Sequence, residues 1–170
     1  HYIDGLTYET NPVPVFSALK TRCSTGLLTV PGVGNGTANT EFEVLTGMNL
    51  EHFGAGEYPF QTILLEEACE SMAFNLKELG YTAHAMHNNT GTFYNRNIVY
   101  SSLGFDTFEP IEYMSHITRN IIGWANDSML TSEILSTLNS TEGPDFVYTI
   151  SVQLHGKFPS EPIEGAPVIC

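Results

Sequence analysis

Basic residues, cysteines and long apolar runs are all scarce in this chain. Only 6 of its 170 residues are Lys or Arg, against 19 Asp and Glu, so the formal net charge is -13. This charge repels nucleic acid and anionic lipid headgroups unless a cation or a local basic pocket intervenes. A metal-dependent site would supply that cation, although acidity that only keeps a domain soluble explains the composition as well. We expect no nucleic-acid partner.

The three cysteines, Cys23, Cys69 and Cys170, fit no metal-binding spacing and leave at least one thiol unpaired. They therefore do not form a disulfide framework. Cys69 falls among the apolar positions of a predicted helix and is most simply a core residue. No apolar run approaches the roughly 20 residues needed to cross a bilayer, and no signal-peptide pattern opens the chain. The sequence predicts a soluble single domain.

Strand and helix patterns alternate along the chain. Apolar periodicity predicts helices over residues 15–20, from about Thr37, over 61–79, over 94–104, and after an N-cap at Asp127 as far as Leu138. Short β-prone runs predict strands over residues 25–30, 81–86 and 146–154. The last run indicates a strand covered on both faces. This alternation predicts an α/β fold with a largely parallel sheet.

Ligands of parallel α/β sheets bind beyond the carboxyl ends of the strands. Three loops occupy that position here. They carry Thr37 after the run 25–30, His87 after 81–86 and His155 after 146–154. The sheet should therefore bring these three side chains to the same edge.

Thr37 follows the glycine-rich turn PGVGNG and opens a predicted helix. It has two interpretations. An ordinary N-cap threonine satisfies a free N–H group at the helix start. Alternatively, a hydroxyl at a helix N-terminus, with glycines allowing close approach, lies where a phosphate would bind and an alkoxide would be stabilised. Spacing alone favours the cap.

A compact polar group surrounds the loop after residues 81–86, with His87 and Tyr94 near Arg96. The Arg96 guanidinium could bind a phosphate through two parallel hydrogen bonds, or it could form an ion pair with one of the many carboxylates. A histidine such as His87 or His155 is, in isolation, more often structural than functional. Together at one sheet edge, these residues predict a site for a phosphorylated ligand.

Three segments, in this order, carry a family resemblance: GNGTANTEFEVLTGM, HNNTGTFYNRNIVYSSLGFDTF and ISVQLHGKFP. They resemble the extracellular catalytic domain of lipoteichoic acid synthases, a phosphoglycerol transferase branch of the sulfatase and alkaline phosphatase superfamily. The resemblance covers about residues 12–159. It implies a three-layer α/β/α fold, incomplete here, with residues 1–170 as part of one sulfatase-like catalytic domain. Exposed strand edges would then favour self-association.

The resemblance implies roles for five residues. Thr37 matches the family's nucleophile, which is also a ligand of the metal, expected to be Mn or Mg. His87, Arg96 and His155 match residues that bind the headgroup. Tyr94 occupies an aromatic position at which the best-known members have tryptophan, and a smaller ring with a hydroxyl would pack differently against glycerol.

In the implied reaction, Thr37 attacks phosphatidylglycerol and expels diacylglycerol, and the glycerophosphoryl group then passes to a glycerophosphate polymer or glycolipid acceptor. The implied location is the extracellular face of the membrane of a Gram-positive bacterium, with membrane contact only through a region before this chain. The family also requires an upstream glutamate and a downstream Asp-His pair as metal ligands. No Asp-His dipeptide occurs here, so we expect little or no turnover by this chain alone.

Other functions remain open at this point. A phosphoethanolamine transferase would also use a threonine nucleophile. A sulfatase-like hydrolase would need a Cys/Ser-x-Pro-x-Arg pattern, whereas Cys23 is followed by Ser-Thr-Gly. A non-catalytic module that binds glycerophosphate or teichoic acid would keep His87, Arg96 and His155 but would tolerate the loss of Thr37.

Overall fold

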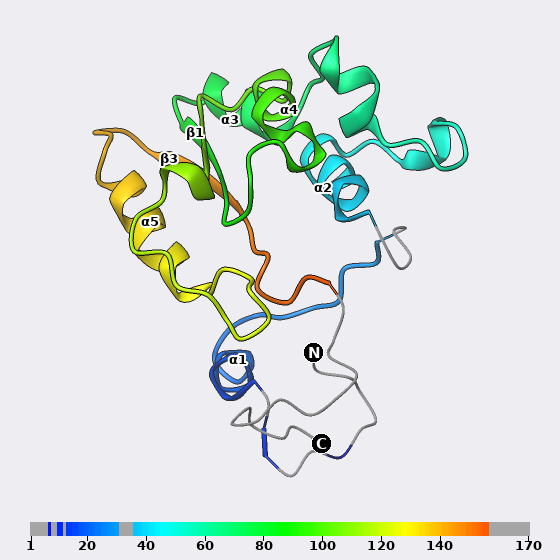
Figure 1. The fold of residues 1–170 in the computed structure, drawn as a ribbon. Helices are drawn as coiled ribbons and strands as arrows, with labels where there is room; N and C mark the ends of the chain where they lie inside the picture. Colours follow the sequence, from blue (N-terminus) through cyan, green and yellow to red (C-terminus); the bar gives the residue numbers. More distant parts are fainter. Residues whose placement is uncertain (1–6, 8–9, 12, 31–35, 157–170) are drawn as a thin grey trace. The chain divides into compact units, whose positions relative to one another are not determined.

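The computed structural model describes residues 7, 10–11, 13–30 and 36–156. The chain divides into two compact units, His1–Thr29 with Gly156–Cys170, and Val30–His155. Figure 1 shows the elements in these residues. The α-helices are α1 (Pro14–Lys20), α2 (Thr37–Thr46), α3 (Met72–Glu78), α4 (Arg96–Ser102) and α5 (Ser128–Leu138). The 3-10 helices are η1 (Leu50–His52), η2 (Pro59–Gln61), η3 (Ile63–Leu65), η4 (Phe93–Asn95) and η5 (Ile111–Tyr113). The strands are β1 (Thr82–His87), β2 (Thr107–Pro110) and β3 (Asp145–Ile150).

The larger unit contains a three-stranded sheet in the order β2-β1-β3. Both pairings are parallel, so the carboxyl ends of all three strands meet at one edge. At that edge His87 is in register with Pro110 of β2 and with Ile150 of β3. The predicted parallel α/β sheet is confirmed.

Helices cover both faces of this sheet (Figure 1). Alternate residues of β1 point to opposite sides. Ala83 and Ala85 join the core cluster that contains residues of α2, α3 and α4, whereas Met86 joins a second cluster with residues of α5. The sheet is therefore the middle of the three layers that the family resemblance implies.

The predicted helix over residues 61–79 is wrong in its first half. The chain forms two short 3-10 helices and an extended segment there, and α3 begins only at Met72. Ser71 is the reason for this late start. Its Oγ accepts the N–H groups of Ala73 at 3.1 Å and Phe74 at 3.4 Å, and its hydroxyl donates to the carbonyl of Leu103. These hydrogen bonds of Ser71 outweigh the apolar periodicity that predicts a helix before Met72.

Cys69 lies in the extended segment before Ser71, not on a helix. Its N–H donates to the carbonyl of Ser102 at 3.0 Å, and its half-buried side chain packs against the edge of the core. Its predicted helical position is therefore wrong, although it does contact the core. Cys170 lies outside the described residues.

Two strand predictions also need correction. Residues 25–30 form no strand and pair with no other strand in the described ranges, and Leu27 is fully exposed. The predicted strand 146–154 ends at Ile150, and its residues are half-buried because β3 is an edge strand of the described sheet. The four-residue strand β2 was too short to give a recognisable sequence pattern.

The remaining helices agree with the sequence patterns, with one difference at α5. Asp127 occupies the N-cap position of α5, but its side chain makes no capping hydrogen bond. Instead its Oδ1 accepts from Asn88 Nδ2 at 3.1 Å and from the Ser151 hydroxyl at 2.6 Å. Asp127 thus joins α5 to the ends of β1 and β3. Among the described residues, no helix has the length and apolar character to span a membrane.

Ser71 provides a test of the fold. Ser71→Ala removes both the cap of α3 and the bond to Leu103, so we expect the free energy of unfolding to fall by about 1–3 kcal/mol. Ser101→Ala, at an exposed position of α4, is the matched control. Urea denaturation monitored by circular dichroism measures both changes. Equal stability of the two variants would contradict this account of the late start of α3.

Candidate active site

Thr37 is the first residue of α2, not its N-cap. Gly36 occupies the N-cap position with φ 87, and no side-chain cap bond is present. The N-cap interpretation of Thr37 is therefore wrong. The Thr37 side chain is exposed and stands in the first helical turn, where backbone N–H groups lack partners within the helix.

Gly36 also allows a close contact between α2 and an aromatic ring. A Cβ at this position would lie 2.8 Å from both Cε1 and Oη of Tyr58, and the positive φ independently favours glycine. The Tyr58 ring in turn stacks on Tyr94, with 6.1 Å between centroids and 18° between planes. Tyr58 therefore links the start of α2 to the loop that follows β1.

His87 ends β1 and is almost completely buried. Its Nδ1 lies 2.9 Å from the Ile150 carbonyl, which can only accept, so Nδ1 carries the proton and Nε2 is a bare acceptor. Within the described residues Nε2 is buried without a hydrogen-bond partner. Burial, followed by the charge of Arg96, lowers the pKa of His87 to about 4. His87 is therefore neutral at pH 7.

His155 is exposed and follows β3 by a short loop. The Phe93 ring contacts both histidines, with its centroid 6.5 Å from that of His87 and 5.7 Å from that of His155. Trp124 lies 5.0 Å from His155 by the same measure. The structure thus brings the two histidines together around Phe93, as their places after β1 and β3 predict. Thr37 differs, because the residues described before it form no strand that would place it at the same edge.

Arg96 is 1% exposed and forms a bidentate ion pair with Glu41. Its Nε donates to Glu41 Oε2 at 3.1 Å, its Nη2 donates to Oε1, and its Nη1 donates to the Phe93 carbonyl at 3.0 Å. The Tyr100 hydroxyl also donates to Glu41 Oε2, at 2.9 Å. Burial opposes the charge of Arg96, but Glu41 outweighs it and raises the pKa of the guanidinium. Of the two sequence interpretations, the carboxylate pair is present here.

Sequence reasoning missed Glu41 and Tyr58. Glu41 carried one signal, because it is a charged residue on the face of α2 that also bears the core residues Ala38, Phe42 and Leu45. A charge on the apolar face of a helix requires a partner. Nothing in the local pattern identifies Arg96, 55 residues away, as that partner.

The cluster offers hydrogen-bonding groups but little uncompensated positive charge. Arg96 is neutralised by Glu41, and His87 is neutral at pH 7. The described residues hold no group of three or more His, Cys, Asp or Glu side chains that could bind a metal ion. A complete Mn or Mg site therefore does not fit within this part of the chain.

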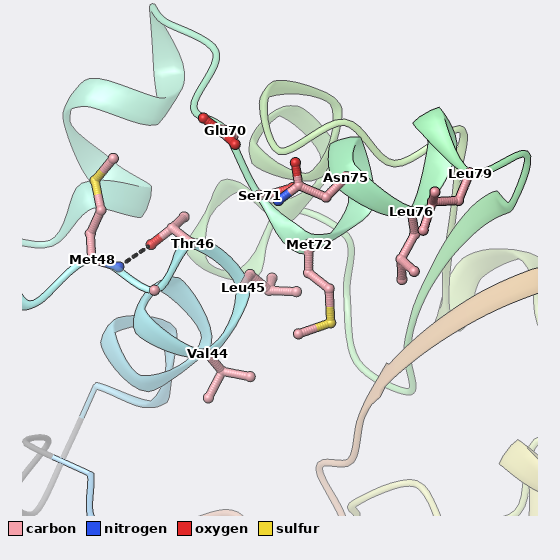
Figure 2. A pocket seen from close by; sticks show the side chains of 11 residues that line it. Val44, Leu45, Thr46, Met48, Glu70, Ser71, Met72, Asn75, Leu76 and Leu79 are labelled. Carbon is pink, nitrogen blue, oxygen red and sulfur yellow. Dashed lines mark hydrogen bonds between the residues drawn. The ribbon is translucent and has the colours of Figure 1, made fainter.

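A separate groove lies at the other end of α2, between its last turn and α3 (Figure 2). Val44, Met48 and Met72 contribute apolar side chains, and Glu70 also lines the groove. None of the five predicted site residues lines this groove. It is therefore distinct from the cluster at the carboxyl edge of the sheet.

Comparison with known proteins gives one family and several similar proteins. The sequence model of the Sulfatase family matches residues 3–167. A protein of Rhizobium meliloti (strain 1021), named for the modification of cyclic beta-1,2-glucan, is 35% identical over 128 residues. That match covers 75% of this chain and 20% of the relative.

Solved structures share the fold. The lipoteichoic acid synthase LtaP from Listeria monocytogenes is 25% identical with a TM-score of 0.60, over 70% of this chain and 29% of LtaP. The Streptococcus pyogenes phosphoglycerol transferase GacH, in complex with sn-glycerol-1-phosphate, is 25% identical with a TM-score of 0.71, over 86% of this chain and 39% of GacH. An alkaline phosphatase superfamily protein from Vibrio parahaemolyticus is 20% identical with a TM-score of 0.54, over 73% of this chain and 31% of that protein, and shows likeness of fold alone. The chain thus spans well under half the length of these relatives.

The buried state of His87 predicts a pH dependence of stability. Its pKa is about 4 when folded, below its ordinary 6.5, so the unfolded chain binds a proton that the folded chain does not. The free energy of unfolding should therefore fall as pH drops from about 6.5 to 4, by up to about 3 kcal/mol from this group. His87→Asn should reduce that slope, whereas His52→Asn, at an exposed position, should not. Urea denaturation at several pH values measures this slope. An NMR titration midpoint of His87 near 6.5 would contradict the prediction.

Proposed function

The chain belongs to the Sulfatase family, and we propose that it is part of a catalytic domain that transfers phosphoglycerol from phosphatidylglycerol, with Thr37 as the nucleophile. One observation carries the proposal. The Thr37 side chain is exposed at the start of α2 and has no capping role. The neighbouring Gly36 lies against the Tyr58 ring, which stacks on Tyr94. The similarity to GacH, whose structure contains sn-glycerol-1-phosphate, supports glycerophosphate as the headgroup.

The proposed transfer has two steps. Thr37 Oγ forms a bond to phosphorus while the bond from phosphorus to the diacylglycerol oxygen breaks, and diacylglycerol leaves with the proton. An acceptor hydroxyl, on a glycerophosphate polymer or a glycolipid, then attacks the glycerophosphoryl-threonine and releases Thr37. The free N–H groups at the start of α2 stabilise negative charge on the phosphoryl oxygens.

The other site residues bind different parts of the headgroup. His87 Nε2 is a neutral acceptor, so it suits a glycerol hydroxyl, which donates, better than a phosphate oxygen, which accepts. His155 lies across Phe93 from it and offers a second ring nitrogen. Tyr94 packs against the glycerol. Arg96 has five N–H donors, of which three are used in the bonds above, and we assign the other two to the phosphate.

The proposal includes a divalent cation, Mn or Mg, and a place on the extracellular face of the membrane of a Gram-positive bacterium. Thr37 is the metal ligand that we assign in this chain, and the other ligands would come from residues beyond those described. We therefore expect little or no turnover by the 170 residues alone. Robust turnover by a preparation of verified intact mass would contradict that expectation.

The first test compares Thr37→Ala with Thr40→Ala, a threonine one turn along the same helix, each in the chain joined to its native flanking sequence. Diacylglycerol release from phosphatidylglycerol vesicles with Mn should fall by about 10³-fold or more for Thr37→Ala and stay unchanged for Thr40→Ala. Binding of sn-glycerol-1-phosphate should survive in both variants.

The outcomes also separate the other functions. Binding of sn-glycerol-1-phosphate without release by any variant would favour a non-catalytic glycerophosphate or teichoic acid binding module. Release from phosphatidylethanolamine vesicles alone would favour a phosphoethanolamine transferase. Equal release by the wild type and Thr37→Ala would contradict the role of Thr37.

A further inference from the structure

The turn that presents Tyr94 has an unfavourable backbone. Tyr94 and Asn95 have φ 56 and φ 55, so two successive residues with side chains adopt the left-handed conformation. Such a conformation is unfavourable for residues with a Cβ, and it persists only where surrounding contacts impose it. The bulky ring of Tyr94 makes this position more unusual. Contacts from outside the turn must therefore hold it.

Arg96 supplies three of these contacts. Its Nη1 donates to the Phe93 carbonyl at 3.0 Å, inside the turn. Its guanidinium carbon lies 5.7 Å from the Phe93 ring centroid and 5.4 Å from that of Tyr94, within the range of cation–π attraction. The side chain of Arg96 thus fixes one backbone carbonyl and both rings of the turn.

Glu41 in turn fixes Arg96. The two side chains are 3% and 1% exposed and pair through Nε and Nη2, and the Tyr100 hydroxyl gives Glu41 a third donor. Burial, and then the charge of Glu41, raise the pKa of Tyr100 well above its ordinary value, so Tyr100 stays a donor. Glu41 also lies one helical turn after Thr37 on α2. One carboxylate therefore connects the helix of Thr37 to the turn of Tyr94.

We propose that Glu41 is a positioning residue of the headgroup site: acting through Arg96, it holds the strained 93–95 turn and sets the Phe93 and Tyr94 rings relative to Thr37. This inference rests on the proposed function. Glutamine at this position would present one oxygen and an N–H₂ group to a guanidinium that only donates. Aspartate would keep the charge on a stem one methylene shorter.

The test uses the chain joined to its native flanking sequence and compares Glu41→Gln with Glu67→Gln, the same change at an exposed position. For Glu41→Gln we expect binding of sn-glycerol-1-phosphate to weaken about tenfold to 100-fold and KM for phosphatidylglycerol to rise more than kcat falls. Backbone hydrogen exchange over residues 91–97 should accelerate. Glu67→Gln should match the wild type in all three. A loss of kcat with unchanged KM and exchange would overturn the proposal.

Two further variants keep the test decisive. Tyr100→Phe removes one donor but leaves the ion pair, so it should alter headgroup binding far less than Glu41→Gln. If Glu41→Gln does not fold, Glu41→Asp replaces it, and wild-type exchange over 91–97 in that variant would overturn the proposal. If the wild type neither binds sn-glycerol-1-phosphate nor releases diacylglycerol, the proposed function fails. Faster hydrogen exchange in Glu41→Gln would still support the stabilisation of the 93–95 turn by Glu41.

Discussion

The buried ion pair between Glu41 and Arg96 is the interaction on which the rest of the site depends. Burying two charges is costly, and it is tolerated only when the geometry is good and the remaining polar atoms are satisfied. Here the pair is bidentate, and Tyr100 and the Phe93 carbonyl complete it. It joins α2 to the start of α4, which are separate in sequence. The turn between β1 and α4 takes its shape from this junction.

The electrostatics of the cluster follow from the same pair. A strongly acidic chain with a net charge of -13 would be expected to expose its few cations to an anionic substrate, yet Arg96 is paired and His87 is neutral. The N–H groups at the start of α2 are then the main donors that the cluster offers a phosphate, because His87 Nε2 is an acceptor. In the proposed reaction these residues therefore supply little positive charge themselves.

Sequence reasoning succeeded where the deciding interactions are local and failed where they are tertiary. The strand β1 and the loop carrying His87 follow from a short apolar run and its polar ending. The late start of α3 depends on a bond from Ser71 to Leu103, 32 residues away, which no periodicity reveals. The pairing of Arg96 likewise depends on Glu41, and the place of Thr37 at N1 depends on the positive φ of Gly36. The family motifs named the candidate residues, but not the contacts that hold them.

We propose that Thr37 becomes covalently bonded to the glycerophosphoryl group during transfer. The direct measurement is mass spectrometry of the chain in its native flanking sequence after acid quenching of a reaction with phosphatidylglycerol in the absence of acceptor. We expect one glycerophosphoryl group on the peptide containing Thr37, localised to that residue by fragmentation. Diacylglycerol release with an unmodified Thr37 peptide, or a modification on another residue, would contradict it.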